Sequence, residues 1–332
     1  MKTFGLLVAG CFTMAAVLCA EPAEAKKKPP VTVRVATPFA AGHILADTAF
    51  KFKEILEKKT HGRMVVNVAT SVLNEQTINA AMTPCDPAER VADIMLTGGQ
   101  PIQDWAPQYF FFNGPYVIED YDHFLRVWNG DLGDEARALI NDAGNLVSLG
   151  TVYRGFRQFT SNEPINVPAD FSGLLLRLPP VPDWVAVWSS LGAVPVQVPL
   201  TGIRDALING TAEATEGDLT QISSLALYEL QEYLSLTNHL VGFGLVLANE
   251  CFMTDLKRSE ERQVEKAMRK ATEFGTDKIF DGEAALLASL QQNGMTVVTP
   301  DAEAIRAAAR PAIDELFATR WTVTTWDEVL AQ

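Results

Sequence analysis

One arginine of the sequence lies where an α/β protein would bind an anion. Arg177 follows the apolar residues 174–176, which predict a short strand, and Pro179-Pro180 prevents further strand pairing. Ligands of open α/β sheets bind at the carboxyl ends of the strands, so Arg177 lies where a ligand is expected. Its guanidinium presents a fixed fork of donors that matches a carboxylate. A structural salt bridge is the other role open to it.

Two more arginines and two tryptophans could share this site. Arg157 is the second candidate for the carboxylate, and Arg154 could take its role. If residues 156–159 are extended, these two arginines point to opposite faces. Trp184 and Trp188 are four residues apart on a predicted helix, so they share one face. They either pack in the core or between domains, or stack on a ring-bearing ligand.

The patterns of metal and nucleophile chemistry are missing from the sequence. It has no Cys-x-x-Cys or His-x-x-x-His spacing, no Ser-His-Asp order and no nucleophile elbow, and it has only four histidines. We therefore predict no catalytic residue, no metal site and no cofactor. Cys85 and Cys251 either form one disulfide or are two buried thiols.

The amino terminus and the charge indicate where the protein works. Lys2 precedes the apolar run 4–20, and a small-x-small site ends at Ala25, as in a secretory signal peptide. We expect cleavage near Ala25 and a periplasmic protein. A lipid anchor at Cys11 or Cys19 is disfavoured. The net charge of −14 argues against nucleic acid as a partner, and we expect a monomer.

Strands and helices alternate in the first third of the chain. Strands are predicted at 31–35, 64–68 and 92–96, and helices at 44–58 and 75–82. This βαβαβ order predicts an α/β fold with mainly parallel pairing. His43 begins the first helix, either as a capped surface residue or as a ligand contact. Thr97 and Glu75 fall at the ligand end of this sheet.

The rest of the chain predicts a second domain and a carboxyl-terminal group of helices. The aromatic run 109–112 is interpreted as core. Residues 145–153 are the predicted crossing strand, and 241–247 the returning one. Apolar residues between 218 and 236 recur with a helical period, which predicts a long helix. Further helices are expected at 259–274, 283–293 and 302–318, and a strand at 295–298.

Three motifs resemble the solute receptors of TRAP transporters, the C4-dicarboxylate-binding type. The family's Gly-x-x-x-Arg-x-Pro strand appears as 173–179, and its Gly-Ala-x-Pro segment as 192–195. Its Ala-Leu-x-x-Gly-x-x-Asp-Gly-x-Glu-Asn block matches residues 206–217 in part. Arg157 matches an arginine of its Arg-x-x-Thr-Ser segment.

The resemblance implies a periplasmic-binding-protein-like fold, with two α/β domains joined by crossing strands and a long helix and the ligand in the cleft. The expected signal peptide is 1–25. Domain I would be 31–153 plus 242–281, and domain II 154–241 plus 282–332.

The candidate substrate-binding residues, taken from the resemblance together with the topology and spacing above, are Arg177, Arg157, Trp184, Thr201, Glu216, Gly217, Thr97, His43 and Glu75. Two departures from the family are Gly217 in place of Asn, and Thr201-Gly202-Ile203-Arg204 in place of Ser-Glu-Val-Tyr. Both remove side chain near the expected pocket and leave room for a larger substrate, such as an aromatic acid.

The implied function is capture of a small organic acid through its carboxylate and delivery to the TRAP membrane permease. A sensory subunit with the same cleft is the alternative. A secreted enzyme acting on an acidic substrate is a remote one.

Overall fold

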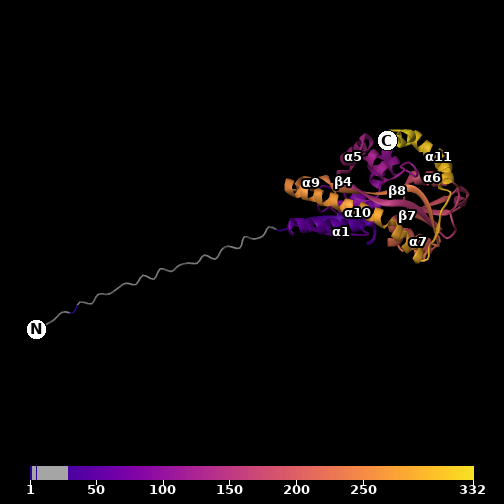
Figure 1. Cartoon of the computed structure of the whole chain (residues 1–332). Helices are drawn as coiled ribbons and strands as arrows, with labels where there is room; N and C mark the ends of the chain where they lie inside the picture. Colours follow the sequence, from indigo (N-terminus) through magenta and orange to yellow (C-terminus); the bar gives the residue numbers. More distant parts are fainter. Residues whose placement is uncertain (2–4, 6–28) are drawn as a thin grey trace.

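The predicted βαβαβ order is confirmed at the amino-terminal end of the fold (Figure 1). The structure is a computed structural model that describes residues 1, 5 and 29–332. The elements in order are β1 (Val31–Ala36), α1 (Ile44–Thr60), β2 (Met64–Ala69), α2 (Glu75–Ala81) and β3 (Ile94–Thr97). The expected cleavage near Ala25 lies outside the described residues.

The later elements are longer and less regular. They are α3 (Gln100–Trp105), η1 (Pro107–Asn113), α4 (Tyr121–Trp128), α5 (Asp131–Gly144), β4 (Leu146–Ser161), η2 (Pro168–Phe171), β5 (Leu175–Leu178), α6 (Pro182–Ser190), β6 (Val194–Gln197), η3 (Leu200–Gly202), α7 (Ile203–Ile208), β7 (Ala214–Asp218), α8 (Leu219–Ser224), η4 (Leu227–Glu229), β8 (Tyr233–Asn249), α9 (Glu250–Asp255), α10 (Arg258–Gln292), β9 (Thr296–Val298), α11 (Ala302–Thr319) and α12 (Trp326–Leu330).

One mixed sheet connects two parallel halves. Its strand order is β2-β1-β3-β8-β4-β7-β5-β6, with β9 paired to β8. β1 pairs in parallel with β2 and β3, and β5 pairs in parallel with β6 and β7. We call these the β1 half and the β5 half. The long antiparallel strands β4 and β8 join the halves, as the predicted crossing strands require.

The long helix is not the one predicted from residues 218–236. Those residues form the end of β7, then α8, η4 and the start of β8. The helical period does not produce one continuous helix, because Ala226 has a φ of 48°. This left-handed conformation prevents α8 from continuing. Residues 237–239, which follow the predicted helix in the sequence, lie within β8.

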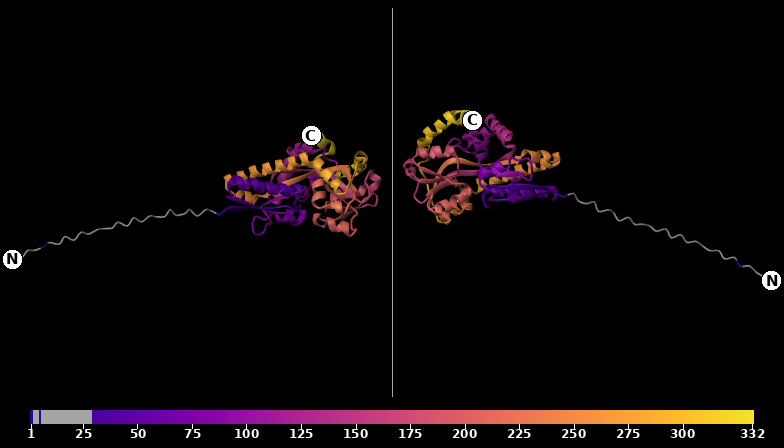
Figure 2. Two further views of the ribbon diagram at one scale, coloured as in Figure 1. Left: turned by 60° about the horizontal axis from the view of Figure 1, so that its bottom comes forward. Right: turned by 180° about the vertical axis from the view of Figure 1, so that it is seen from behind.

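α10 is the long helix that contacts both halves. Its 35 residues merge the two helices predicted at 259–274 and 283–293. It packs on α1 of the β1 half and on β4 and α8 (Figures 1 and 2). Gly275 permits the close approach to α1, because a Cβ there would lie 2.3 Å from Thr48 Oγ1.

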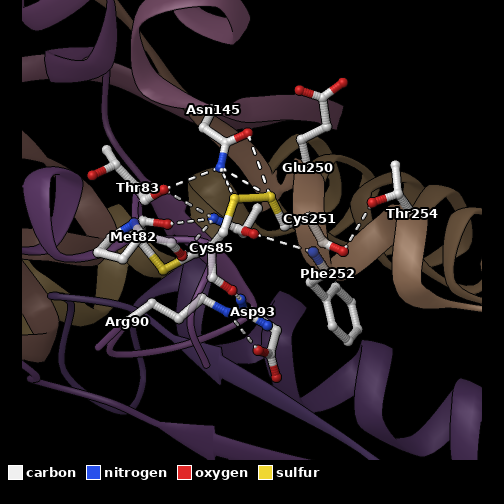
Figure 3. The surroundings of a disulfide bond; sticks show 12 residues. Met82, Thr83, Cys85, Arg90, Asp93, Asn145, Glu250, Cys251, Phe252 and Thr254 are labelled. Carbon is white, nitrogen blue, oxygen red and sulfur yellow. Dashed lines mark hydrogen bonds and ion pairs between the residues drawn. A yellow bond between two sulfur atoms is a disulfide. The ribbon is translucent and has the colours of Figure 1, made fainter. Parts of the chain in front are cut away.

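The aromatic run 109–112 is buried, which confirms its interpretation as core. A disulfide joins Cys85 to Cys251, so the alternative of two free thiols is wrong. Figure 3 shows the Asn145 amide directed at both sulfur atoms and at the carbonyl of Thr83. The bond links the segment after α2 to α9. Among the described helices, none is long and apolar enough for a membrane span.

Candidate functional site

Arg177 is a buried cation that has no carboxylate partner among the described residues. Its side chain lies near the end of β5 and is 1% exposed. Its Nε donates to the carbonyl of Val198 at 2.8 Å, and the described residues give its guanidinium no other hydrogen bond. Burial lowers the pKa of Arg177 to about 10, partly opposed by Glu216, so the side chain remains charged at neutral pH. Such a group can accept an anion.

Arg157 is already paired. Its guanidinium forms a bidentate ion pair with Glu216, whose two carboxylate oxygens lie 2.5 and 2.7 Å away. His239 lies behind Glu216, with Nε2 at 3.4 Å from that carboxylate. Burial would raise the pKa of Glu216, but Arg157 and His239 outweigh it and hold that pKa at about 2. Glu216 is therefore an ionised partner of Arg157.

Arg154 reaches the same site through a β-bulge. It donates to Asp218 through Nε and Nη2, at 3.1 and 2.7 Å. A register shift in β4 between Tyr153 and Gly155 makes Arg154 the extra residue, and Gly155 has the left-handed φ of 85° that this bend requires. The predicted opposite orientation of Arg154 and Arg157 is wrong, because the bulge changes the side-chain alternation.

A cavity with about 20 Å³ of free volume lies between the two halves at these arginines. It is lined by Glu75, Gly99, Gln100, Asn113, Arg154, Arg157, Arg177, Pro179, Trp184, Leu200 and Gln221. This volume holds about one water molecule and is far below the usual range for ligand sites, so the halves must move apart before an organic acid can enter. Most of the lining side chains are charged or carry amides, so the cavity suits a small polar anion.

The two tryptophans of α6 have different environments. Trp184 lines the cavity, lies over the Arg157 guanidinium at 5.2 Å, and donates from Nε1 to the carbonyl of Asn113 at 2.7 Å. Trp188 is fully buried against Phe159 and Phe171. Trp188 is thus core, whereas Trp184 forms part of the wall and links the halves.

Glu75 is the acidic residue of the cavity wall. It begins α2 and is 8% exposed. Its Oε1 accepts from the backbone N–H of Gly98, and its Oε2 from the side chain of Gln100, both at 2.9 Å. Burial raises its pKa, and Arg154 chiefly opposes that rise. Thr97, at the end of β3, is buried but does not line the cavity.

His43 is buried rather than exposed, so its description as a surface cap is wrong. It does cap α1, since Nδ1 accepts from the N–H of Leu45 at 3.1 Å. Its ring stacks on Phe39, and its Nε2 lies 3.7 Å from Asp218 Oδ2, which is longer than a hydrogen bond. His43 is absent from the cavity lining, but Asp218, which it approaches, is the ion-pair partner of Arg154.

The pKa of His43 predicts a pH-dependent stability. Burial lowers this pKa from 6.5 to about 4, against the opposing charge of Asp218. The unfolded chain therefore binds the His43 proton between pH 6.5 and 4 and the folded chain does not, so stability falls as pH falls through this window. We expect His43 to account for a loss of roughly 3 kcal/mol in unfolding free energy.

His43→Asn is the variant that measures this effect, because asparagine retains a capping oxygen. Urea unfolding at pH 6.5 and pH 4 should show a smaller loss of stability in the variant than in the natural protein. Equal losses in the two proteins would contradict the assignment.

Neighbouring side chains fill the space that Gly202 and Gly217 were expected to leave for a substrate. A Cβ on Gly217 would lie 2.5 Å from the Gln221 side chain, and one on Gly202 would lie 2.7 Å from that of Val198. The expectation of room for a larger substrate is therefore wrong in this structure. Thr201 is exposed and lies outside the cavity, next to Leu200.

A family model accounts for most of the chain. The model named DctP, described as "Bacterial extracellular solute-binding protein, family 7", matches residues 35–320. The chain belongs to this family. Members of family 7 are solute-binding receptors and not enzymes, which agrees with a cavity that holds binding groups between two halves.

Periplasmic binding proteins of other bacteria resemble the chain in sequence and fold. The sialic acid-binding periplasmic protein SiaP of Vibrio cholerae is 30% identical over 211 residues, 64% of this chain and 66% of that protein. A TRAP periplasmic solute binding protein from Roseobacter denitrificans, solved with bound L-galactonate, has a TM-score of 0.81 at 26% identity. That comparison covers 91% of this chain and 99% of the other. A TRAP periplasmic solute binding protein from Shewanella oneidensis with bound succinate has a TM-score of 0.83 at 20% identity. That comparison covers 91% of this chain and 99% of the other. At that identity it shows the fold alone.

Some lining residues of this family 7 protein were missed by sequence reasoning. Gln100, Asn113 and Gln221 supply the amides of the cavity, and each follows a strand or ends a short helix. Gln221 lies in α8 and its side chain covers Gly217 of β7, a contact that can be found only once this short helix is recognised. The described residues contain no cluster of His, Cys, Asp or Glu that could hold a metal ion.

Proposed function

We propose that the protein is a periplasmic receptor that captures a small organic acid through its carboxylate and delivers it to the permease of a TRAP transporter. The observation that carries this proposal is Arg177, a buried cation in the cavity between the halves that has no carboxylate partner among the described residues. A ligand carboxylate would supply the missing charge and accept from its two Nη groups.

The pairing of the other two arginines supports a single primary anchor. Arg154 and Arg157 are matched by Asp218 and Glu216, so their charges are largely compensated. Each nevertheless lines the cavity, so remaining N–H groups can contact a ligand held at Arg177. The ligands of two relatives, sialic acid and L-galactonate, both carry one carboxylate.

Binding by hinge closure fits the placement of the cavity between two halves. We propose domains of 31–153 plus 242–281 and 154–241 plus 282–332. The proposed boundaries at 153 and 242 coincide with the bulge at Gly155 and its partner Gly242. Closure of the halves around a ligand would bury it and create the surface that a permease reads.

A thermal-shift screen against organic acids tests the function. An acid at 100 times its dissociation constant adds about 2.7 kcal/mol of stability, so we expect the melting temperature to rise by several degrees. The neutral analogue of each active acid, galactitol for galactonate, should produce no shift. Equal shifts from the neutral analogues, or no shift from any acid, would contradict the proposal.

A further inference from the structure

The cavity wall in the β1 half contains a buried carboxylate that the capture of one anion does not require. Glu75 comes from α2 in the β1 half, whereas Arg177 comes from β5 in the other half. Both line the same cavity. A ligand that holds its carboxylate at Arg177 and reaches the β1 half would therefore meet the wall that carries Glu75.

The contacts of Glu75 leave acceptor capacity on both oxygens. Gly98 donates to Oε1 and Gln100 donates to Oε2, one hydrogen bond each. Each carboxylate oxygen can accept more than one hydrogen bond. A hydroxyl of the ligand can therefore donate to Glu75, whereas a carboxylate in the same place has no proton to donate.

The charges around the cavity also favour one negative charge on the ligand. Arg154, Arg157 and Arg177 face Glu216 and Asp218, which are ionised, and Glu75. With Glu75 ionised, these three arginines and three acidic residues have no net charge before a ligand enters. With Glu75 neutral, their net charge is +1. A dianion would leave excess negative charge in a buried site in either case, which is costly.

Gln100, Asn113 and Gln221 add amide groups to the same lining. Amides can donate to and accept from hydroxyls, so the far part of the cavity suits a polyol chain better than an aryl group.

We propose that Glu75 is the specificity-determining residue that restricts the site to hydroxylated monocarboxylates and excludes dicarboxylates. This inference rests on the proposed function, since it assumes a carboxylate at Arg177. Glu75 accepts a hydrogen bond from a hydroxyl at the far end of the ligand and repels a second carboxylate placed there.

Matched acid pairs test this inference by calorimetric titration. Galactonate and galactarate share one carbon skeleton and differ in a terminal CH₂OH or COO⁻, and erythronate and meso-tartrate form a shorter pair. We expect the monocarboxylate of any pair that binds to bind at least tenfold more tightly than its dicarboxylate. Glu75→Gln, which removes the charge with little change of shape, should reduce that ratio at least tenfold.

Glu89→Gln is the matched control, because it makes the same change on an exposed residue beyond α2. The ratio of monocarboxylate to dicarboxylate affinity should stay unchanged in this variant. Equal affinity for both members of a pair in the natural protein would overturn the inference and leave the receptor function intact. An unchanged ratio in a folded Glu75→Gln variant would also overturn it, since Glu75 would then only hold Gly98 and Gln100. If the variant does not fold, the ratio of the two affinities in the natural protein tests the inference. Failure of every acid to bind would overturn the receptor function, and this inference with it.

Discussion

Arg177→Lys is expected to weaken organic-acid binding by at least 2 kcal/mol, roughly thirtyfold, as for truncation of a buried charge pair. Lysine retains the charge but lacks the planar fork that binds both oxygens of a carboxylate. The melting temperature of the unliganded protein should change little, because the substitution removes one hydrogen bond, from the Nε of Arg177 to the carbonyl of Val198. Titration calorimetry and thermal melting measure the two effects.

Arg157→Lys is the matched control for this experiment. Arg157 holds Glu216 in a bidentate ion pair, so its replacement should lower the melting temperature and reduce affinity less than Arg177→Lys does. The opposite pattern, a low melting temperature with full affinity in Arg177→Lys, would make Arg177 a structural residue.

Glu216→Gln is expected to destabilise the folded protein by about 3 kcal/mol or more, because it leaves the buried Arg157 guanidinium without its counter-charge. The pKa of Glu216 is lowered from 4.5 to about 2 in the folded state, so its ionised form contributes stability above pH 4.5. That contribution is lost as pH falls toward 2. Urea unfolding of both proteins should therefore give a stability difference that is full at pH 7 and smaller at pH 3.

An exposed ion pair provides the control. Arg204 and Glu229 also pair at 2.8 Å, but both side chains are at least one-third exposed. Glu229→Gln should cost less than about 1 kcal/mol. A loss in Glu216→Gln that is no larger than in Glu229→Gln would show that the buried pair does not stabilise the site.

Local pattern was sufficient to predict the strand that carries Arg177 and the βαβαβ opening. A short apolar strand ended by prolines and a regular alternation of elements need only neighbouring residues to be recognised. The same kind of evidence predicts Trp184 on a helix that follows Arg177, and the structure places this residue on α6, in the cavity wall.

Features that depend on distant pairing could not be predicted in this way. The bulge at Arg154 is set by the register of β4 against β8, some 90 residues apart in the chain, and it brings two arginines together that alternation would separate. The helical period across 218–236 was misleading because a left-handed Ala226 divides it. Gln221 fills the space beside Gly217, and this depends on a side-chain position that no sequence motif encodes.

The most direct test of the central claim is a crystal structure of the protein with the acid that stabilises it most in the thermal-shift screen. The predicted result is a ligand carboxylate within hydrogen-bond distance of both Nη atoms of Arg177, with the ion pairs of Arg154 to Asp218 and Arg157 to Glu216 still formed. A ligand whose carboxylate lies outside this cavity, or on Arg154 or Arg157 with Arg177 uninvolved, would contradict it.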